Sequence, residues 1–184
     1  MSSAHHRKKH PEAVRQHLLA ATARLLLEKG PASVTLDAVS QAAGVSKGGL
    51  LHHFPSKPAL LDGLFDDVTE RFDRALGERM EADPAAEGRF TRAYLAVCFS
   101  EDGLADGEGW RALTVAMISE PHLRERLRAW TDARAAAQAE DSLDALLVRY
   151  AVDGVWLSDL LGAPSMTAPQ RAAMMERLAA LSRP

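Results

Sequence analysis

The sequence is poor in the residues that cross-link chains, bind metals or cross membranes. Its 184 residues include one cysteine, Cys98, which excludes a disulfide within the chain and a cysteine-rich metal site. No run of about 18 apolar residues occurs, so we expect no membrane-spanning segment. The basic residues 7–9 have no apolar stretch behind them and therefore do not form a secretion signal. These absences favour a protein of the reducing cytoplasm that carries no cofactor and no built metal site.

Signatures of catalysis are missing as well. No nucleophile–base–orienter set is legible, no glycine-rich phosphate loop follows a strand, and neither an HExxH nor a CxxC motif occurs. The hydrophobic content of 47% is ordinary for a folded protein and argues against disorder. The sequence therefore predicts a folded protein that is not an enzyme.

Charge is unevenly distributed along the chain. The formal net charge is −3, but residues 1–57 hold eight Lys and Arg against three acidic residues, whereas the remainder holds 14 against 22. This asymmetry predicts an N-terminal domain that faces nucleic acid and an acidic body behind it. Residues 1–10 are basic and polar, and we expect a flexible arm there. It either reaches the minor groove or phosphates of DNA or is a solvated tail, which the general behaviour of chain termini favours.

Residues 35–57 read as two short helices around a tight turn, followed by the start of a third helix. Thr35 can cap the first helix, because its hydroxyl can accept a backbone N–H one turn further on. Gly44 can end that helix, because glycine enters the left-handed conformation without steric cost. The apolar residues between these two positions recur at helical spacing.

The second helix begins after Ser46, a second N-cap, and ends at Pro55. Leu50 and Phe54 point inward on the expected helix. The residues on its outward face are Lys47, Gly48, His52 and His53. Two helices joined by a three- or four-residue turn that contains glycine form the helix-turn-helix arrangement, whose second helix enters a major groove of DNA.

Residues 15–61 resemble the DNA-binding domain of the tetracycline-repressor (TetR) family of one-component regulators. Three pieces match the family pattern in register: Arg15–Gly30, Thr35–Ser46 and Gly48–Lys57. The sequence departs from that pattern at Gly49, where Thr, Ser or Ala is common, and at Leu51, where Tyr is common. The resemblance implies that the protein binds a DNA operator as a homodimer. The two C-terminal helices of each protomer would together form a four-helix bundle.

Helical periodicity continues through the rest of the chain, with no strand-period segment. The fold class predicted is all-α with about nine helices: a helix-turn-helix DNA-binding domain and a helical body for effector binding and dimerisation. We place the arm at 1–10, the DNA-binding domain at 11–57 and the body at 58–184. The expected helices outside 35–57 are 11–29, 57–80, 85–101, 106–119, 121–139, 142–161 and 167–181.

Eight residues are candidate DNA contacts. They are Thr35, Ser46, Lys47, Gly48, Gly49, His52, His53 and Lys57. Thr35 and Lys57 stand at helix starts, where backbone amides point toward an anion, and are candidate phosphate anchors. The glycine pair either is merely tolerated or lets the backbone approach DNA closely, which its place in the first helical turn favours. His52 is the preferred donor to a base or phosphate, while His53 either binds DNA or packs.

Eight residues of the body are candidate effector contacts, because they supply polarizable apolar surface or a carboxylate. They are Tyr94, Cys98, Phe99, Trp110, Met117, Trp130, Asp153 and Trp156. A pocket lined this way would bind a hydrophobic or flat aromatic effector, with cation–π attraction if the effector is charged. A plain helical core is the alternative, and it is the better explanation for any single residue of the set.

Asp153 stands in an otherwise apolar helical stretch, where a carboxylate costs free energy unless it is paired. Three roles stay open for it: a structural pair with Arg149 one turn earlier, a polar contact between helices, or an anchor for a cationic effector. Gly154 beside it favours a close helix approach, so this helix and the last one are the candidate dimer interface.

The function that these patterns predict is a ligand-responsive transcriptional repressor. It would bind a palindromic operator as a homodimer and leave it when a small hydrophobic or aromatic effector binds the body. The alternative is a DNA-bound interaction protein that does not respond to a small molecule.

Overall fold

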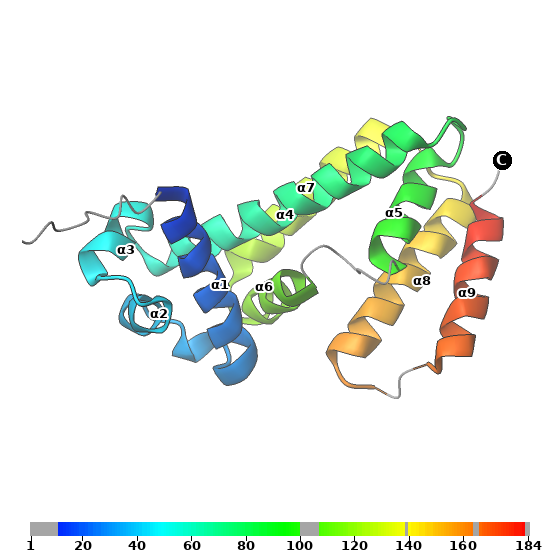
Figure 1. Ribbon diagram of the computed structural model, residues 1–184. Coiled ribbons are helices and arrows are strands. Elements are labelled where there is room, and N and C mark those ends of the chain that lie inside the picture. Colours follow the sequence, from blue (N-terminus) through cyan, green and yellow to red (C-terminus); the bar gives the residue numbers. More distant parts are fainter. Residues whose placement is uncertain (1–10, 100–106, 139, 164–165, 183–184) are drawn as a thin grey trace, which may run out of the picture. The chain divides into compact units, whose positions relative to one another are not determined.

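A computed structural model gives the fold, and it describes residues 11–99, 107–138, 140–163 and 166–182 (Figure 1). The predicted arm at 1–10 lies outside the described residues. Within the described part the chain is all-α, with nine α-helices, one short 3-10 helix (η1) and no strand. The elements are α1 (Pro11–Lys29), η1 (Pro31–Ser33), α2 (Leu36–Ala43), α3 (Lys47–His53), α4 (Lys57–Ala82), α5 (Arg89–Phe99), α6 (Gly107–Ser119), α7 (Pro121–Gln138), α8 (Leu143–Leu160) and α9 (Ala168–Leu181).

The chain forms two compact units. The first unit holds residues 1–67 and 111–123, and the second holds 68–110 and 124–184. The helices α4, α6 and α7 therefore contribute residues to both units. The sequence pattern predicted a domain boundary after Lys57 and assigned 111–123 to the body, so the compact units do not coincide with that functional division.

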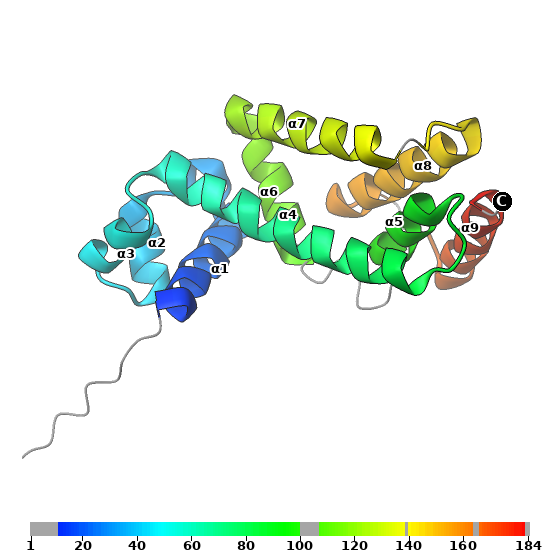
Figure 2. The ribbon, with the colours of Figure 1, turned by 90° about the horizontal axis from the view of Figure 1, so that it is seen from above.

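In the first unit, α1 packs against α2 and η1, and α2 packs against α3 (Figure 2). Each α-helix of this group contributes a fully buried side chain: Leu18 in α1, Val39 in α2 and Leu50 in α3. Phe54, directly after α3, is also buried, and its ring lies where a Cβ atom on Gly63 of α4 would stand. Glycine at that position is what lets the end of α3 pack closely on α4.

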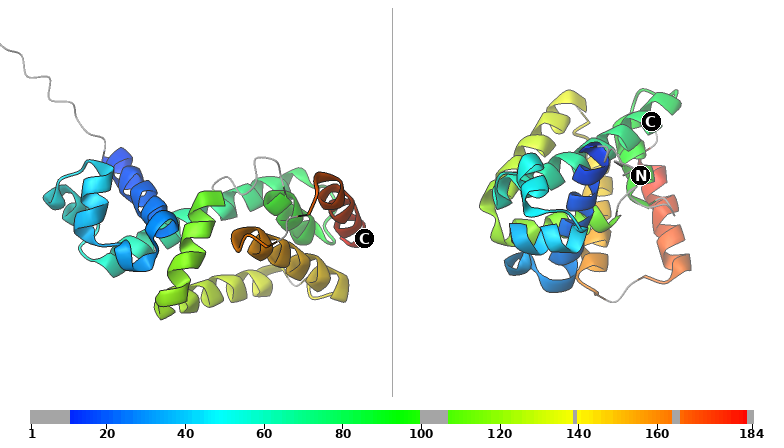
Figure 3. Two further views of the ribbon diagram at one scale, coloured as in Figure 1. Left: turned by 90° about the horizontal axis from the view of Figure 1, so that it is seen from below. Right: turned by 60° about the vertical axis from the view of Figure 1, so that its left-hand side comes forward.

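In the second unit, α5 packs against α8 and α9, and α8 packs against α9 (Figure 3). One apolar cluster joins α4 to α5 through Phe72, Leu76 and Phe90. A second cluster joins α5 to α8 and α9 through residues such as Val152 and Leu178. The short helix α5 is thus the element that both clusters of this unit share.

The helix expected at 85–101 starts four residues late, at Arg89. Asp83 and Pro84 end α4, and Gly88 in the left-handed region, with φ of 70°, turns the chain into α5. A Cβ atom on Gly88 would stand 2.5 Å from the carbonyl oxygen of Ser182, so the turn also sits tightly against the end of α9. The periodicity of the sequence does not contain this tertiary contact.

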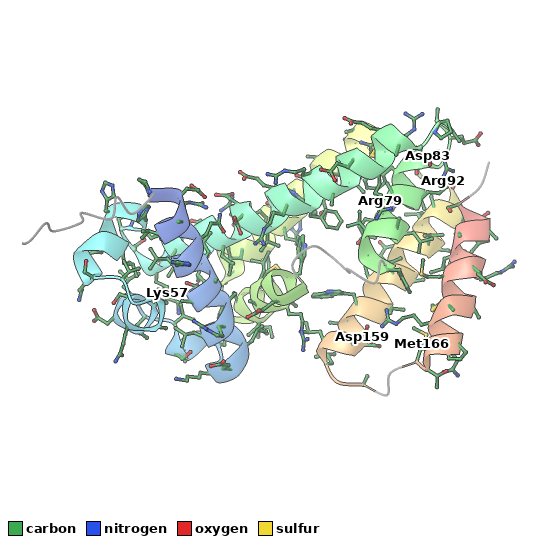
Figure 4. The ribbon with its side chains drawn as sticks, viewed as in Figure 1. Lys57, Arg79, Asp83, Arg92, Asp159 and Met166 are labelled. Carbon is green, nitrogen blue, oxygen red and sulfur yellow. The ribbon has the colours of Figure 1, made fainter. Side chains whose placement is uncertain are left out.

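Arg92 connects the segment between α4 and α5 to the end of α9 through hydrogen bonds (Figure 4). Its Nε donates to Asp83 Oδ2 at 2.7 Å, and its two terminal nitrogens donate to the carbonyl oxygens of Glu87, Ala85 and Ser182 at 2.7–2.8 Å. The same guanidinium lowers the pKa of the Asp83 carboxyl through the hydrogen bond.

No helix among the described residues has the length and apolar character needed to cross a membrane.

Candidate DNA-binding and ligand-binding sites

The helix α3 is held by the caps that the sequence predicts. The Ser46 hydroxyl accepts the N–H of Gly49 at 3.1 Å, and Gly44 ends α2 in the left-handed conformation with φ of 64°. Leu50 is buried, whereas Ser46, Lys47 and Gly48 are exposed. One face of α3 is therefore fixed in the core, and the other is open to a partner.

The two glycines of α3 differ in their surroundings. A Cβ atom on Gly48 would meet nothing within 4 Å, whereas one on Gly49 would lie 3.1 Å from Val45 Cγ1 and 3.2 Å from Ser46 Oγ. The close neighbours in the turn therefore explain why glycine stands at position 49. No contact in the structure explains Gly48, which agrees with a role outside the fold.

The basic side chains of α3 differ in their exposure and contacts. Lys47 pairs with Asp37 of α2 at 2.9 Å, and both side chains are largely exposed. His52 is exposed, while His53 is half-buried with its ring edge-on to His52 at 5.4 Å. His52 is therefore the freer of the two histidines to donate to DNA.

The two predicted phosphate anchors have different environments. Thr35 is exposed and caps α2, accepting the Ala38 N–H at 3.1 Å. Lys57 is half-buried; its Nζ donates to the Pro31 carbonyl oxygen at 3.0 Å and lies 3.5 Å from Glu120 Oε1 (Figure 4). In this conformation Lys57 fastens the start of α4 to η1 and to the α6–α7 linker instead of presenting a free charge.

A cavity of about 390 Å³ lies in the second unit. Its wall is formed by α4, α5, α7 and α8 and by the segment that leads into α8. The residues that line it are Phe72, Phe90, Tyr94, Trp130, Thr131, Asp132, Arg134, Ala135, Gln138, Glu140, Leu146, Arg149, Tyr150 and Asp153. This volume falls within the range of small-molecule sites.

Aromatic rings make up the inner wall of the cavity. The Phe72 ring is at the centre of this cluster, with the rings of Tyr94 and Trp130, and of Trp110 behind the wall, edge-on to it at centroid distances of 5.6–5.8 Å. Phe90 stacks on Tyr94 at 6.2 Å. The lining of the cavity is therefore largely aromatic on this side.

Tyr94 and Asp153 are hydrogen-bonded across the cavity wall, the phenol donating to Asp153 Oδ1. Desolvation raises the pKa of Asp153 and raises that of Tyr94 well above its usual range. Burial also raises the pKa of the Cys98 thiol, to about 12. Much of the Asp153 residue is solvent-exposed on α8, so solvent screens part of the effect on its carboxyl group.

The two arginines of the cavity wall are already engaged. The Arg134 guanidinium pairs with Asp73 and lies over the Trp130 ring, 3.4 Å from its centroid. Arg149 donates to the Glu140 carbonyl oxygen at 2.9 Å and does not pair with Asp153, so the structural pair considered from sequence is not formed.

The predicted effector residues divide into three groups. Tyr94, Trp130 and Asp153 line the cavity. The residues that pack behind it, against the same aromatic cluster, are Cys98, Trp110 and Trp156. The two remaining residues do not join it: Phe99 is in the second apolar cluster, and Met117 belongs to the first unit.

Sequence reasoning missed most of the polar lining and also Phe72 and Phe90. Phe72 carries the i+3/i+4 periodicity of α4, so the pattern indicates a core position and nothing more. Glu140 was missed because it lies outside any helix; its carboxylate accepts the N–H groups of Phe90 and Thr91 at 3.0 Å. No local signal in the sequence connects residues 140 and 90.

An apolar stripe runs along the exposed side of α8. Five large apolar side chains of this stripe are exposed: Leu143, Leu147, Tyr150 and Leu157 on α8 and Leu161 directly after it. With Gly154 they form two interleaved series at seven-residue spacing, which is the pattern of a seam between two helices. The structure thus has an apolar helix face that its own chain does not cover within the described residues.

The helices α1–α3 form a helix-turn-helix arrangement in which α3 is capped and has one exposed face. The same chain has a helical body with an aromatic cavity. These features are those of a helix-turn-helix DNA-binding protein. Comparison with protein families agrees. Residues 18–64 match the family described as bacterial regulatory proteins, tetR family, and residues 88–183 match the tetracyclin repressor-like C-terminal domain. The chain belongs to the TetR family of helix-turn-helix transcriptional regulators, a family of regulators rather than enzymes.

Individual relatives are distant. The chain is 32% identical over 123 residues to the transcriptional regulator EthR of Mycolicibacterium smegmatis, a match that covers 65% of this chain and 56% of EthR. A TetR-family regulator from Rhodococcus sp. superposes with a TM-score of 0.68 at 21% identity, covering 92% and 99% of the two chains. The multidrug-binding protein EbrR in complex with malachite green superposes with a TM-score of 0.66 at 24% identity, covering 91% and 96%.

Proposed function

We propose that this protein is a homodimeric transcriptional repressor that leaves its operator when a small apolar or aromatic molecule binds the body. The observation that carries the proposal is the exposed face of α3, which is capped by Ser46 and anchored by Leu50 as a recognition helix would be. The domain division follows from it: residues 11–57 bind DNA, and 58–184 bind the effector and the second protomer.

The DNA contacts proposed are those on the exposed face of α3 and at the start of α2. Gly48 lets the backbone approach DNA, His52 and Lys47 donate to bases or phosphates, and Thr35 places the α2 N-terminus at a phosphate. Lys57 adds a phosphate contact only if it leaves Pro31 and Glu120, so we give it a secondary role.

The dimer proposed forms through α8 and α9. The apolar stripe of α8 supports this, because an exposed seam at seven-residue spacing matches a partner helix of the same kind. Gly154, at its centre, lets two helix backbones approach closely. A two-fold dimer would place one α3 on each half-site of a palindrome.

Effector binding is proposed to act through the helices that both units share. The cavity is lined by α4 and α7, and Lys57 at the first residue of α4 contacts Glu120 directly before α7. A ligand that binds one arrangement of these helices better than the other shifts the population toward that arrangement. EbrR, a structural neighbour, is a multidrug-binding protein solved in complex with malachite green, which supports a small organic ligand for this cavity.

The proposal is tested by fluorescence anisotropy with DNA from immediately upstream of the gene. We expect tight binding, weaker binding to a scrambled sequence, and a steep dependence on salt, because each phosphate contact lowers the slope of log K against log salt by about 0.9. His52→Ala should weaken operator binding, whereas His17→Ala, at an exposed position of α1, should not. Equal binding to both sequences at every salt concentration would contradict a specific regulator.

A further inference from the structure

We propose that Leu51 is a specificity-determining residue of α3, and that it reads the C5-methyl group of a thymine in the major groove of the operator. This inference rests on the proposed function of α3 as the recognition helix. It goes further by assigning one base of the operator to one side chain. It also gives a role to a residue that stands where the family pattern commonly has Tyr.

The exposed face of α3 consists of four residues: Lys47, Gly48, Leu51 and His52. Their spacing of i, i+1, i+4 and i+5 places them on one side of the helix, because residues three and four apart are neighbours on a helix surface. Leu50 faces the core instead. Leu51 therefore lies within the face that is proposed to meet DNA, one turn after Lys47 and one turn after Gly48.

Leu51 is the one large apolar side chain on this face. Its exposed fraction is 40%, whereas that of the neighbouring Leu50 is 0%. Among the exposed large apolar side chains in the described part of the chain, it is the one that the helices α1–α3 contribute. The core of the first unit therefore explains leucine at position 50, while the exposed part of Leu51 is available to a partner.

DNA offers few apolar groups to such a side chain. The phosphates are charged, and the base edges in the major groove are hydrogen-bond donors and acceptors, except for the C5-methyl group of thymine. A leucine placed against a polar base edge would deprive that edge of water without supplying a hydrogen bond, which is unfavourable. Contact with the methyl group instead removes apolar surface of both partners from water. Thymine is therefore the base that Leu51 favours.

Gly48 brings Leu51 within reach of a base edge. It precedes Leu51 by three residues, so the two positions are neighbours on the helix surface. A Cβ atom on Gly48 would meet nothing within 4 Å, so at this position no side chain holds the backbone away from DNA. A close approach of the helix lets leucine, which is shorter than the usual tyrosine, touch the floor of the groove.

The inference is tested on the operator that wild type selects from a random duplex library. We expect a thymine at one fixed position in both half-sites. Replacing this pair of thymines by deoxyuridine removes their methyl groups and nothing else. Operator affinity, measured by fluorescence anisotropy, should then fall about tenfold, because one buried methyl group in each half-site is worth roughly three- to fourfold. Deoxyuridine at the other thymines of the operator is the matched DNA control and should have a smaller effect.

Leu51→Ala removes the apolar contact, and alanine is as good a helix former as leucine. We expect this variant to bind the thymine and deoxyuridine operators with equal affinity, and to select no thymine at that position. Ile118→Ala is the matched protein control, because Ile118 is an exposed apolar side chain on α6 in the same unit. This control should keep the full preference for thymine. Equal melting temperatures of wild type and both variants would show that the fold is intact.

Three results would overturn the inference: an operator with no thymine at a fixed position, equal affinity of wild type for the operator and all its deoxyuridine versions, or a preference for thymine that Leu51→Ala retains in full. In each case a specific operator exists, so the DNA-binding function stands while the role of Leu51 is wrong. If wild type enriches no sequence at all, the proposed function fails and the inference fails with it.

Discussion

At the scale of single residues, Arg92 adds hydrogen bonds where α5 already packs against α9. Its four hydrogen bonds hold the α4–α5 link against the end of α9 in a half-buried position. Lysine cannot reproduce this fork of donors. We expect Arg92→Lys to lower the free energy of unfolding by roughly 2 kcal/mol, since charged hydrogen bonds are worth about 1.5–3 kcal/mol each and lysine retains some of them. Urea denaturation measures this, and Arg177→Lys, exposed on α9, should change nothing.

The Asp153 carboxyl group should make the stability of the folded protein depend on pH. Its pKa is raised in the folded, ligand-free protein, mainly by desolvation, so the ionised form is penalised above that pKa and the penalty fades as pH falls through it. The groups that face it are the neutral Tyr94 phenol and Cys98 thiol and the more distant Arg149.

Wild type should therefore gain stability relative to Asp153→Asn as the pH falls through the raised pKa. Melting curves of the two proteins across that pH window measure the difference. The same pH dependence in both proteins would contradict a desolvated Asp153 carboxylate.

At the scale of elements, glycine in α3 should lower the stability of the fold and raise the affinity for DNA. Space around Gly48 admits a Cβ atom, so Gly48→Ala should stabilise the protein by about 0.5 kcal/mol, because alanine loses less backbone entropy in a helix. The added methyl group would meet the DNA backbone, so operator affinity should fall. Gly49→Ala should stabilise less, because Val45 and Ser46 would have to move. Chemical denaturation and anisotropy on the same samples separate the two effects, and unchanged operator affinity in Gly48→Ala would refute the close approach.

Local rules predicted most of the elements. Thr35, Ser46 and Thr167 each accept the backbone N–H of the residue three positions on, as an N-cap should, and α1 has the expected bounds. These features depend on residues within one helical turn. The start of α5 was predicted four residues early, because Gly88 is fixed there by contact with Ser182, which lies far away in sequence.

At the scale of the whole molecule, the α8 stripe should decide the oligomeric state. A carboxylate at Leu157 would have to be desolvated in a helix seam, so Leu157→Glu should yield a folded monomer in sedimentation equilibrium. Ala136→Glu, exposed on α7, is the control and should stay dimeric. A dimeric Leu157→Glu protein would show that the copies meet elsewhere.

The cavity of the second unit shows what the sequence does not reveal. Three of the eight predicted residues line it, because aromatic residues and an acidic residue in an apolar stretch are conspicuous in any helical sequence. Met117 does not join them, since periodicity indicates that a residue is buried but does not say in which unit. The position of Glu140 on the N-terminus of α5 is likewise a tertiary fact.

The central claim is that this chain reads DNA as a two-fold dimer through α3. In vitro selection from a random duplex library tests it most directly, because the selection itself finds the operator sequence. We expect enrichment of an inverted repeat whose half-sites lie about one helical turn, or a multiple of it, apart. Enrichment should weaken with His52→Ala and also with the monomeric Leu157→Glu. No enrichment with wild type, or enrichment of a single site without dyad symmetry, would contradict the claim.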